Sequence, residues 1–347
     1  MAAPPPSASE AGAIDSALIN PGLIDPGLID RFRSDTTALL DAPLASAHPL
    51  ALAVSGGPDS MAMLALAAAA CPGWVIAATV DHRLRADSAD EAAMVARWCA
   101  ASGIPHRTLA LEPLPAGNLH AEARAARYTA LTDWASGEGA QYLATAHHAD
   151  DQAETFLMRA NRGSGLAGLA GIRPRRRDRD LTVIRPLLSW RRATLRTMAE
   201  AAGIPFVDDP SNDADRFDRT HLRRHLAAHD LLDPAALARS AGCCAEADAD
   251  LRAVRDWLWA ARAHRGQDVA INVADLPRAL RRMLARMAIE QVRTANTITR
   301  PGFSESTHVE ALLDALEAGK SATQAGVMAS ARDTTWYFRE APPRRSL

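Results

Sequence analysis

The chain has 347 residues, of which 48% are hydrophobic and 23% charged, and its formal net charge is −2. This length suits two domains with full cores, and the near-neutral balance gives no general sign of a nucleic-acid partner. No apolar run is long enough to span a bilayer, and the N-terminus lacks the basic start of a secretory signal, so we expect no membrane contact and no export. The four cysteines show neither a metal-site spacing nor a disulfide framework, which predicts a reducing, cytoplasmic location.

Residues 1–45 are predicted to be a low-complexity N-terminal tail. The segment contains Pro4-Pro5-Pro6 and a short echo of Gly-Leu-Ile-Asp at 22–25 and 27–30. A short helix near 31–40 is one option within it. We assign no chemistry to this part.

Residues 46–232 alternate between strand and helix patterns. Strands are predicted to end at Val54 and to cover 74–80, 106–111 and 141–146, with helices between them. This alternation predicts an α/β domain with a doubly wound parallel sheet, in which ligands bind at the carboxyl ends of the strands. From 186 onward the pattern becomes helical. We therefore expect a second, helix-rich domain over 233–347, with short strands near 272 and at 334–339.

The first strand leads into a tight turn and a helix, at Ser55-Gly56-Gly57-Pro58-Asp59-Ser60. Glycines let the backbone approach a ligand closely, and a helix start offers unpaired N–H groups to an anion such as phosphate. Ser55 and Ser60 add hydroxyl donors, while Asp59 suits Mg²⁺ bridged to phosphate. An ordinary capped helix start is the alternative. No Gly-Lys-Ser/Thr follows, so this is not a Walker loop. The motif resembles Ser-Gly-Gly-x-Asp-Ser, the PP-loop of the N-type ATP pyrophosphatases.

A second motif follows the strand at 141–146 and opens a helix. It places two imidazoles and three carboxylates close together, from His147, His148, Asp150, Asp151 and Glu154. Such crowding is typical of a proton-transfer or metal–phosphate site. The acidic residues alone also suit an ordinary helix N-terminus, but the histidines do not. A zinc site would need a cysteine or a third spaced histidine, and the motif supplies neither.

Arginines cluster at 173–179, 191–196 and 216–224, whereas Lys320 is the only lysine. Guanidinium groups stay charged and bind phosphate, so these clusters suit an RNA backbone. Any single cluster also suits a solvated surface.

Four motifs in chain order carry a resemblance to a known family. They are Asn118 with Ala-Arg-x-x-Arg-Tyr at 123–128, His-His-Ala-Asp-Asp-Gln-Ala-Glu-Thr at 147–155, Arg-Gly-Ser-Gly at 162–165, and Asp-Pro-Ser-Asn at 209–212 before an arginine-rich helix. Together with the PP-loop they resemble the tRNA(Ile)-lysidine synthase family, from about residue 50 to 232 and more loosely to 339. Thr220 and Arg83 depart from the family pattern, which has Asn and often Gly there. We expect a short form without the extra C-terminal domain of longer members.

The resemblance implies an adenine nucleotide alpha hydrolase-like PP-loop fold and an ATP-dependent ligase. The wobble cytidine of an isoleucine tRNA with a CAU anticodon would attack the α-phosphate of ATP and release pyrophosphate. The ε-amine of free L-lysine would then attack C2 and release AMP, which changes codon reading from AUG to AUA. ATP and Mg²⁺ are the implied cofactors. A tRNA-contacting role is implied for the second domain, and a homodimer is left open.

The resemblance also implies roles for individual residues. Catalytic roles fall to Asp59, Arg124, Arg127, His147, Asp150 and Asp151, with Asp59 or Asp151 as metal ligand. The arginines would balance charge on the adenylate, and His147, Asp150 or Asp151 would accept a proton from the amine. ATP would be bound by Ser55, Gly56, Gly57, Pro58, Asp59 and Ser60. Contacts to tRNA would come from Asn118, Glu154, Arg162, Asn212, Arg219 and Arg223.

Two alternatives come from other chemistry. A 2-thiocytidine synthetase of the PP-loop type would need cysteine pairs for sulfur transfer, and the sequence has no CxxC; Pro58 also stands where that enzyme has Lys. A non-catalytic nucleotide- or RNA-binding module that kept the fold is the other alternative, and the complete set of Ser55, Asp59, His147 and Asp151 weighs against it.

Overall fold

The computed structural model describes residues 23–81, 88–111, 119–208, 222–224, 226, 231–304 and 307–342. The chain divides into two compact units, Met1–Ala245 and Glu246–Leu347. The division falls inside helix α9 (Pro234–Arg262), whereas the sequence-based boundary lies just before that helix.

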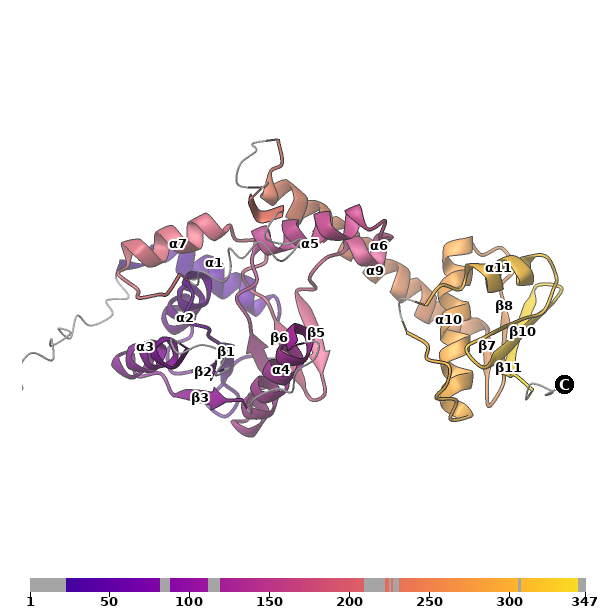
Figure 1. Cartoon of the computed structure of the whole chain (residues 1–347), viewed down its shortest axis with the longest axis horizontal. Helices are drawn as coiled ribbons and strands as arrows, with labels where there is room; N and C mark the ends of the chain where they lie inside the picture. Colours follow the sequence, from indigo (N-terminus) through magenta and orange to yellow (C-terminus); the bar gives the residue numbers. More distant parts are fainter. Residues whose placement is uncertain are drawn as a thin grey trace, which may run out of the picture. The chain divides into compact units, whose positions relative to one another are not determined.

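The first unit is built on a six-stranded sheet (Figure 1). Its strands, in spatial order, are β3 (His106–Ala110), β2 (Val75–Asp81), β1 (Leu50–Ala53), β4 (Tyr142–Ala144), β6 (Leu181–Ile184) and β5 (Arg175–Asp178). The first five pair in parallel, and β5 is an antiparallel edge. The predicted doubly wound parallel sheet is confirmed. The order places β1 beside β4 at the point where the chain changes direction across the sheet, which is where such folds bind ligands.

Helices cover both faces of this sheet. Successive residues of β1 accordingly pack into two hydrophobic cores, one on each face. Leu50 and Leu52 pack with α2 (Pro58–Ala70), α3 (Ser88–Ala101) and α7 (Arg192–Ala201). On the other face, Ala51 packs with Leu131 and Ala135 of α4 (Leu119–Gly137). Strands buried on both faces read as continuous apolar runs, which explains why these strands could be identified from the sequence.

Helix α1 (Pro26–Thr37) lies within the residues assigned to a tail, yet it is part of the first unit. It packs on α2, and Phe32 is fully buried. Asp35 accepts a hydrogen bond from the indole Nε1 of Trp190 at 2.8 Å. The carbonyl of Trp190 in turn accepts a hydrogen bond from the backbone N–H of Ala149 at 2.8 Å, at the start of α5 (Ala149–Asn161). Thus α1 is linked to the helix that carries the second motif.

The β5–β6 hairpin was not predicted. The sequence of β5 is Arg-Arg-Arg-Asp, which lacks the apolar alternation of a half-buried strand, and we interpreted it only as a basic cluster. The strand forms because β6 is fully buried and offers it a neighbouring edge.

The second unit combines helices with an antiparallel sheet. Helices α10 (Arg278–Ala295) and α11 (Glu310–Glu317) pack on five strands, and the shared core includes Leu284, Leu313, Trp336 and Phe338. In spatial order the strands are β7 (Ala263–Arg265), β8 (Val269–Asn272), β11 (Thr335–Glu340), β10 (Val327–Arg332) and β9 (Ala322–Gln324). The region is helix-rich as predicted, but the sheet extends well beyond the two strands anticipated.

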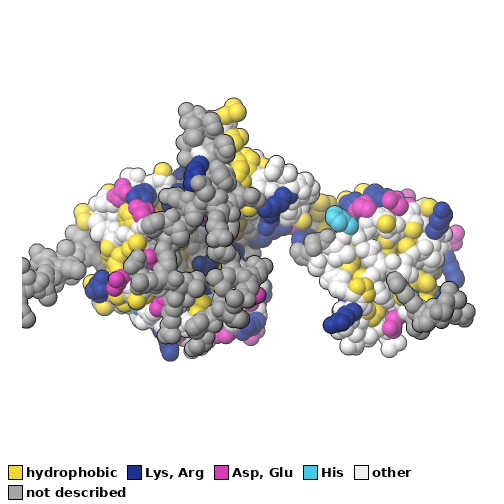
Figure 2. Space-filling model, in the orientation of Figure 1, with side chains coloured by type: hydrophobic (Ala, Val, Ile, Leu, Met, Phe, Trp, Pro, Cys, Tyr) yellow, Lys and Arg dark blue, Asp and Glu magenta, His cyan; other side chains and the backbone are white. Residues whose placement is uncertain are grey.

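Ion pairs join α10 to α11. Arg278 pairs with Glu310 at 3.0 Å and with Asp314 at 2.5 Å, and Arg282 pairs with Glu310 at 2.5 Å. Hydrogen bonds from Arg282 and Arg278 lower the pKa of Glu310 to about 2. Acidic and basic side chains accordingly lie side by side over α11 in Figure 2. In the part of the chain that is described, no helix has both the length and the apolar character needed to cross a membrane.

Candidate active site

The PP-loop connects β1 to α2 and is held by its own hydroxyls. Ser60 Oγ accepts a hydrogen bond from the backbone N–H of Ser55 at 3.1 Å and donates one to the carbonyl of Gly57 at 2.9 Å. Gly56 has φ +85°, a conformation that favours glycine. Helix α2 begins at Pro58, so its first N–H groups have no intrahelical acceptors. The turn is therefore shaped before any anion binds.

A second segment supports this loop from outside. The backbone N–H of Val207 donates to the carbonyl of Gly56 at 3.0 Å. The next residue, Asp208, accepts two hydrogen bonds from Arg196 at 2.8 and 2.7 Å, and that guanidinium also lies 5.1 Å from the ring centre of Phe206. The pKa of Asp208 is lowered because Arg196 hydrogen-bonds to its carboxylate. Helix α7 thereby fixes the segment that flanks the loop.

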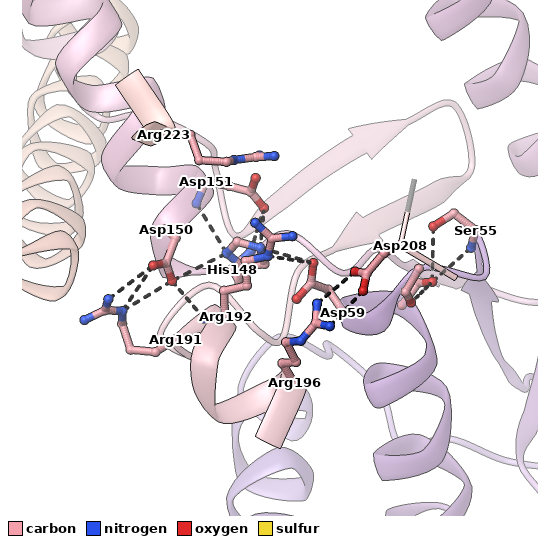
Figure 3. A network of polar contacts seen from close by, with 12 residues as sticks. Ser55, Asp59, His148, Asp150, Asp151, Arg191, Arg192, Arg196, Asp208 and Arg223 are labelled. Carbon is pink, nitrogen blue, oxygen red and sulfur yellow. Dashed lines mark hydrogen bonds and ion pairs between the residues drawn. The ribbon is translucent and has the colours of Figure 1, made fainter. Parts of the chain in front are cut away.

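His148 is the centre of the carboxylate cluster (Figure 3). Its side chain is buried, and its Nε2 lies 3.5 Å from Oδ2 of Asp59 and 3.5 Å from Oδ2 of Asp151. It is also the N-cap of α5, because Nδ1 accepts from the N–H of Asp151 at 3.3 Å and Asp151 Oδ2 accepts from the N–H of His148 at 3.1 Å. This capping box explains how two histidines and an acidic pair stand at one helix start.

Opposing effects act on the His148 imidazole. Burial works to lower its pKa, but a hydrogen bond to Asp59 and the charges of Asp151, Asp59 and Asp150 outweigh burial, so the pKa is raised. The carboxylates thus make a local field that favours positive charge at this point.

Asp150 is held in place by the start of α7. Arg191 donates to its carboxylate from Nε at 3.3 Å and from Nη2 at 3.2 Å, and the backbone N–H of Arg192 donates at 2.8 Å. These hydrogen bonds fix the orientation of the Asp150 carboxylate, which suits a positioning role.

Asp59 has a buried oxygen, Oδ1, without a hydrogen-bond partner among the described residues. Its other oxygen lies 3.9 Å from Nε of Arg192 in addition to His148. A buried, unpaired carboxylate oxygen at a phosphate-binding turn fits a hard cation. No group of three or more His, Cys, Asp and Glu side chains within the described ranges is arranged to hold a metal. Mg²⁺, however, commonly binds through one or two carboxylates plus substrate phosphates, so Asp59 and Asp151 fit that ion.

Glu154 and Arg223 form a buried ion pair. The Glu154 side chain is 2% exposed, and Arg223 donates to it from Nε at 2.8 Å. Burial works to lower the pKa of Arg223, but the hydrogen bond and charge of Glu154 raise it overall. The tRNA contacts expected of both residues stay a prediction; in the structure the two side chains pair with each other.

The first turn of α5 is fixed by a close backbone approach. Gln152 donates to the carbonyl of Ile172 at 3.0 Å and accepts from its N–H at 2.6 Å. Gly171 has φ +64°, and a Cβ there would lie 2.3 Å from Oε1 of Gln152. Glycine is required at this position.

The other predicted site residues make contacts of their own or lie outside the described residues. Nδ1 of His147 is 2.9 Å from Oγ1 of Thr145, and Arg162 is the C-cap of α5. Arg124 and Arg127 gather at the ring of Tyr128, at 5.1 and 5.8 Å from its centre. Asn118, Asn212 and Arg219 lie outside the described residues.

Sequence reasoning missed His148, Arg191 and Arg192 as site residues. His148 stood in the quoted motif, but its sequence neighbour His147 was chosen, because the sequence does not show which imidazole caps the helix. Arg191 and Arg192 were noted only as part of a basic cluster. Their pairing with Asp150 and Asp59 depends on the β6–α7 connection, which carries no periodic pattern.

Known proteins resemble the chain along most of its length. The model of the PP-loop domain family matches residues 30–230. A tRNA(Ile)-lysidine synthase from Novosphingobium aromaticivorans is 42% identical over 321 residues, covering 91% of this chain and 94% of that protein. Another from Zymomonas mobilis is 38% identical over 324 residues, covering 90% and 94%. Among solved structures, a U34-tRNA thiolase from Methanococcus maripaludis matches with a TM-score of 0.53 at 18% identity, over 63% of this chain and 79% of that one. The last likeness shows the fold alone.

Proposed function

The chain belongs to the tRNA(Ile)-lysidine synthase family of PP-loop proteins, and from that premise we infer that it is an ATP-dependent ligase that forms lysidine on tRNA(Ile). The observation that carries this inference is the meeting of two helix starts. Asp59 in the first turn of α2 lies 3.5 Å from His148, the N-cap of α5. One helix start holds phosphate in this fold, and the other brings carboxylates to it.

In the first step, the reacting group is the wobble cytidine of a tRNA with a CAU anticodon. Its O2 attacks the α-phosphorus of ATP, the bond to the oxygen of the β-phosphate breaks, and pyrophosphate leaves. We propose that the loop from Ser55 to Ser60 holds the departing pyrophosphate, because its hydroxyls and free helix N–H groups are already oriented. No reorganisation of the loop is then needed as charge moves to the leaving group.

We propose that Asp59 and Asp151 would hold Mg²⁺ at this site. The partnerless buried oxygen of Asp59 supports the assignment. When bound, the ion would supply charge neutralisation for the triphosphate. Asp150 would act as a positioning residue, since Arg191 and the N–H of Arg192 fix it.

In the second step, the ε-amine of free L-lysine attacks C2 of the adenylated base. The C2–O2 bond breaks, and AMP leaves with that oxygen. The amine must give up a proton, and we propose His147 or Asp151 as acceptor, because both belong to the motif that opens α5 beside Asp59. Arg124 and Arg127 would balance negative charge on the adenylate.

Incorporation of labelled lysine into an isoleucine tRNA transcript tests the proposal, with ATP present and with ATP omitted. We expect ATP-dependent label that disappears when the wobble cytidine is changed. ATP cleavage to AMP and pyrophosphate without label would keep adenylation and contradict lysine as the nucleophile. Absence of both label and cleavage would favour a non-catalytic binding module.

No structural observation favours the thiolation alternative. Cys71 and Cys99 are buried in the core, and burial raises the pKa of Cys99 to about 12. A thiol with so high a pKa is a poor nucleophile. Cys243 and Cys244 are adjacent residues on α9.

A further inference from the structure

One stripe of α4 changes character along the helix. Leu131 and Ala135 on its inward side pack against the sheet. One turn earlier, at helical spacing, the same side carries Arg124, Arg127 and Tyr128. Because α4 leads into β4 and so runs against the parallel strands, its N-terminal half lies toward their carboxyl ends, the edge at which this fold binds ligands.

Four guanidinium groups converge on Tyr128. Arg124, Arg127 and Arg176 lie 5.1, 5.8 and 5.1 Å from the ring centre. The fourth is Arg185, which directly follows β6 and is 6% exposed; Tyr128 acts on it by raising its pKa against the effect of burial. Arg185 also donates from Nη1 to the carbonyl of Arg173 at 2.7 Å. We call Arg124, Arg127, Arg176, Arg185 and the ring they surround the Tyr128 cluster.

The positive charge of the Tyr128 cluster is poorly balanced. Among the described residues, the carboxylate that pairs with it is Asp178, 2.8 Å from Arg176. The buried Nε of Arg185 has no acceptor within the described ranges. Burial first, and neighbouring arginines in addition, lower the pKa of Arg127 and Arg185. Collecting guanidinium groups costs stability unless an anion joins them, so the cluster has the character of an anion site.

Successive side chains of β5 point to opposite faces of the hairpin, so only some of its arginines belong to this site. Arg176 pairs in register with Val183, whose side chain belongs to the core on the α4 side. Arg175 pairs in register with Ile184 of the other core, and its guanidinium binds the carboxylate of Asp41. Two neighbouring arginines of one strand thus have different environments. Arg175 pairs with Asp41, and Arg176 lies over the ring of Tyr128.

We propose that the Tyr128 cluster binds a backbone phosphate of the tRNA. The proposal rests on the proposed function, in which RNA is the substrate. A phosphate matches the forked donors of several guanidinium groups, and the side chain of Arg176 is 49% exposed, so a polymer can reach it. Arg124 and Arg127 are assigned to the adenylate in the proposed function, so the backbone phosphate is assigned to the exposed side of the cluster, at Arg176. The sequence left the arginine cluster at 173–179 open between an RNA backbone and a solvated surface, and the proposal assigns one of its arginines, Arg176, to the RNA.

The test compares Arg176→Ala with Arg175→Ala, which removes the same charge from the opposite face of the same strand. We measure the Kd of each protein for the tRNA transcript as a function of salt. Loss of one phosphate contact reduces the slope of log K against log salt by about 0.7 to 0.9. Between about 50 and 200 mM salt, wild-type binding therefore weakens about threefold more than that of Arg176→Ala. Arg175→Ala keeps the wild-type slope.

Further measurements distinguish binding of tRNA from binding of a small anion and from failure of the proposed function. Arg176→Lys retains the charge and is expected to retain the slope while binding more weakly, because an ammonium lacks the fork. An unchanged slope in Arg176→Ala, or an equal fall in Arg175→Ala, overturns the proposal. A raised KM for ATP or lysine with an unchanged tRNA slope assigns the cluster to a small anion instead. Failure of the proposed function would show separately, as absence of lysine incorporation by wild-type protein that still binds tRNA.

Discussion

Nε2 of His148 lies 3.5 Å from Oδ2 of Asp59, and this pair joins the first turn of α2 to the start of α5. The two residues are far apart in the sequence, because they belong to different strand-to-helix connections of the sheet. The contact exists because β1 and β4 are neighbours. Chemistry at this site therefore depends on both helix starts at once.

Asp59→Asn is expected to abolish lysidine formation while the protein stays folded. The change removes a charge whose Oδ1 has no partner among the described residues and whose Oδ2 faces His148 and Arg192, and an amide of the same shape keeps the packing, so the protein should still unfold as a folded domain. Lysine incorporation and thermal unfolding are the two measurements. Normal turnover by this variant would contradict the role of Asp59.

His148→Ala and His148→Asn separate capping from chemistry. Alanine removes the N-cap acceptor of α5 and should lower the free energy of unfolding by about 0.5–2 kcal/mol. Asparagine is a good N-cap and should recover most of that stability, but it cannot take a positive charge between Asp59 and Asp151. Denaturant unfolding and lysine incorporation should therefore diverge in His148→Asn. Full activity in the asparagine variant would limit His148 to capping.

Gly171→Ala is expected to destabilise the protein more than Gly163→Ala. Both glycines have positive φ, at +64° and +68°, so both substitutions carry a backbone cost of about 1–2 kcal/mol. Only at 171 does the new Cβ meet Gln152, 2.3 Å away, whereas nothing lies within 4 Å at 163. Moving Gln152 breaks its hydrogen bonds to Ile172, which adds about 1–3 kcal/mol. Equal losses in denaturant unfolding would show that Gln152 moves freely.

Arg223→Ala is expected to lower the free energy of unfolding by about 3–5 kcal/mol, because it leaves the buried carboxylate of Glu154 without this partner. The double variant Arg223→Ala with Glu154→Gln should recover part of the loss, since it also removes the charge that Arg223 balances. Chemical denaturation of wild type, both single variants and the double variant gives the coupling. Additive effects would refute a direct pair and return Arg223 to the predicted tRNA contacts.

The pH dependence of stability should reveal the pairing of Glu310 with Arg278 and Arg282. The pKa of Glu310 is lowered in the folded protein from 4.5 to about 2, so its contribution is present above pH 4.5. That contribution is lost as pH falls through about 2. Wild type should therefore be more stable than Glu310→Gln above pH 4.5, with a gap that narrows on acidification and closes near pH 2. A gap independent of pH would contradict the charge pairing.

The sequence predicted most of the sheet and the PP-loop, because buried parallel strands and a Gly-Gly turn leave local patterns. It did not predict which neighbours each carboxylate has. The contacts of Asp150 with Arg191 and with the backbone of Arg192 span 41 and 42 residues. Charge pairing at such separation leaves no periodic trace. The same reason hid the Glu154–Arg223 pair, whose partners are separated by 69 residues.

Elements without an apolar pattern were also missed. The edge strand β5 is formed by arginines and an aspartate, and its structure comes from its neighbour β6. Helix α1 was placed in a tail, with a short helix near 31–40 as one option, because a short Gly-Leu-Ile-Asp echo resembles low complexity; the segment nevertheless buries Ile24 and Phe32. Tertiary packing outweighed local composition in both cases.

The hydrogen bonds from Ala149 to Trp190 and from Trp190 to Asp35 have a practical consequence for protein engineering. A shortened version that begins after α1 would leave the indole N–H of Trp190 without its acceptor. It would also remove Phe32 from the core and expose the side chains that Phe32 covers. Trp190, which accepts the hydrogen bond from the start of α5, would then be held less firmly, although no site residue had been deleted. Affinity tags and fusion partners should therefore be joined ahead of Ile24, and α1 should be kept as part of the folded first unit.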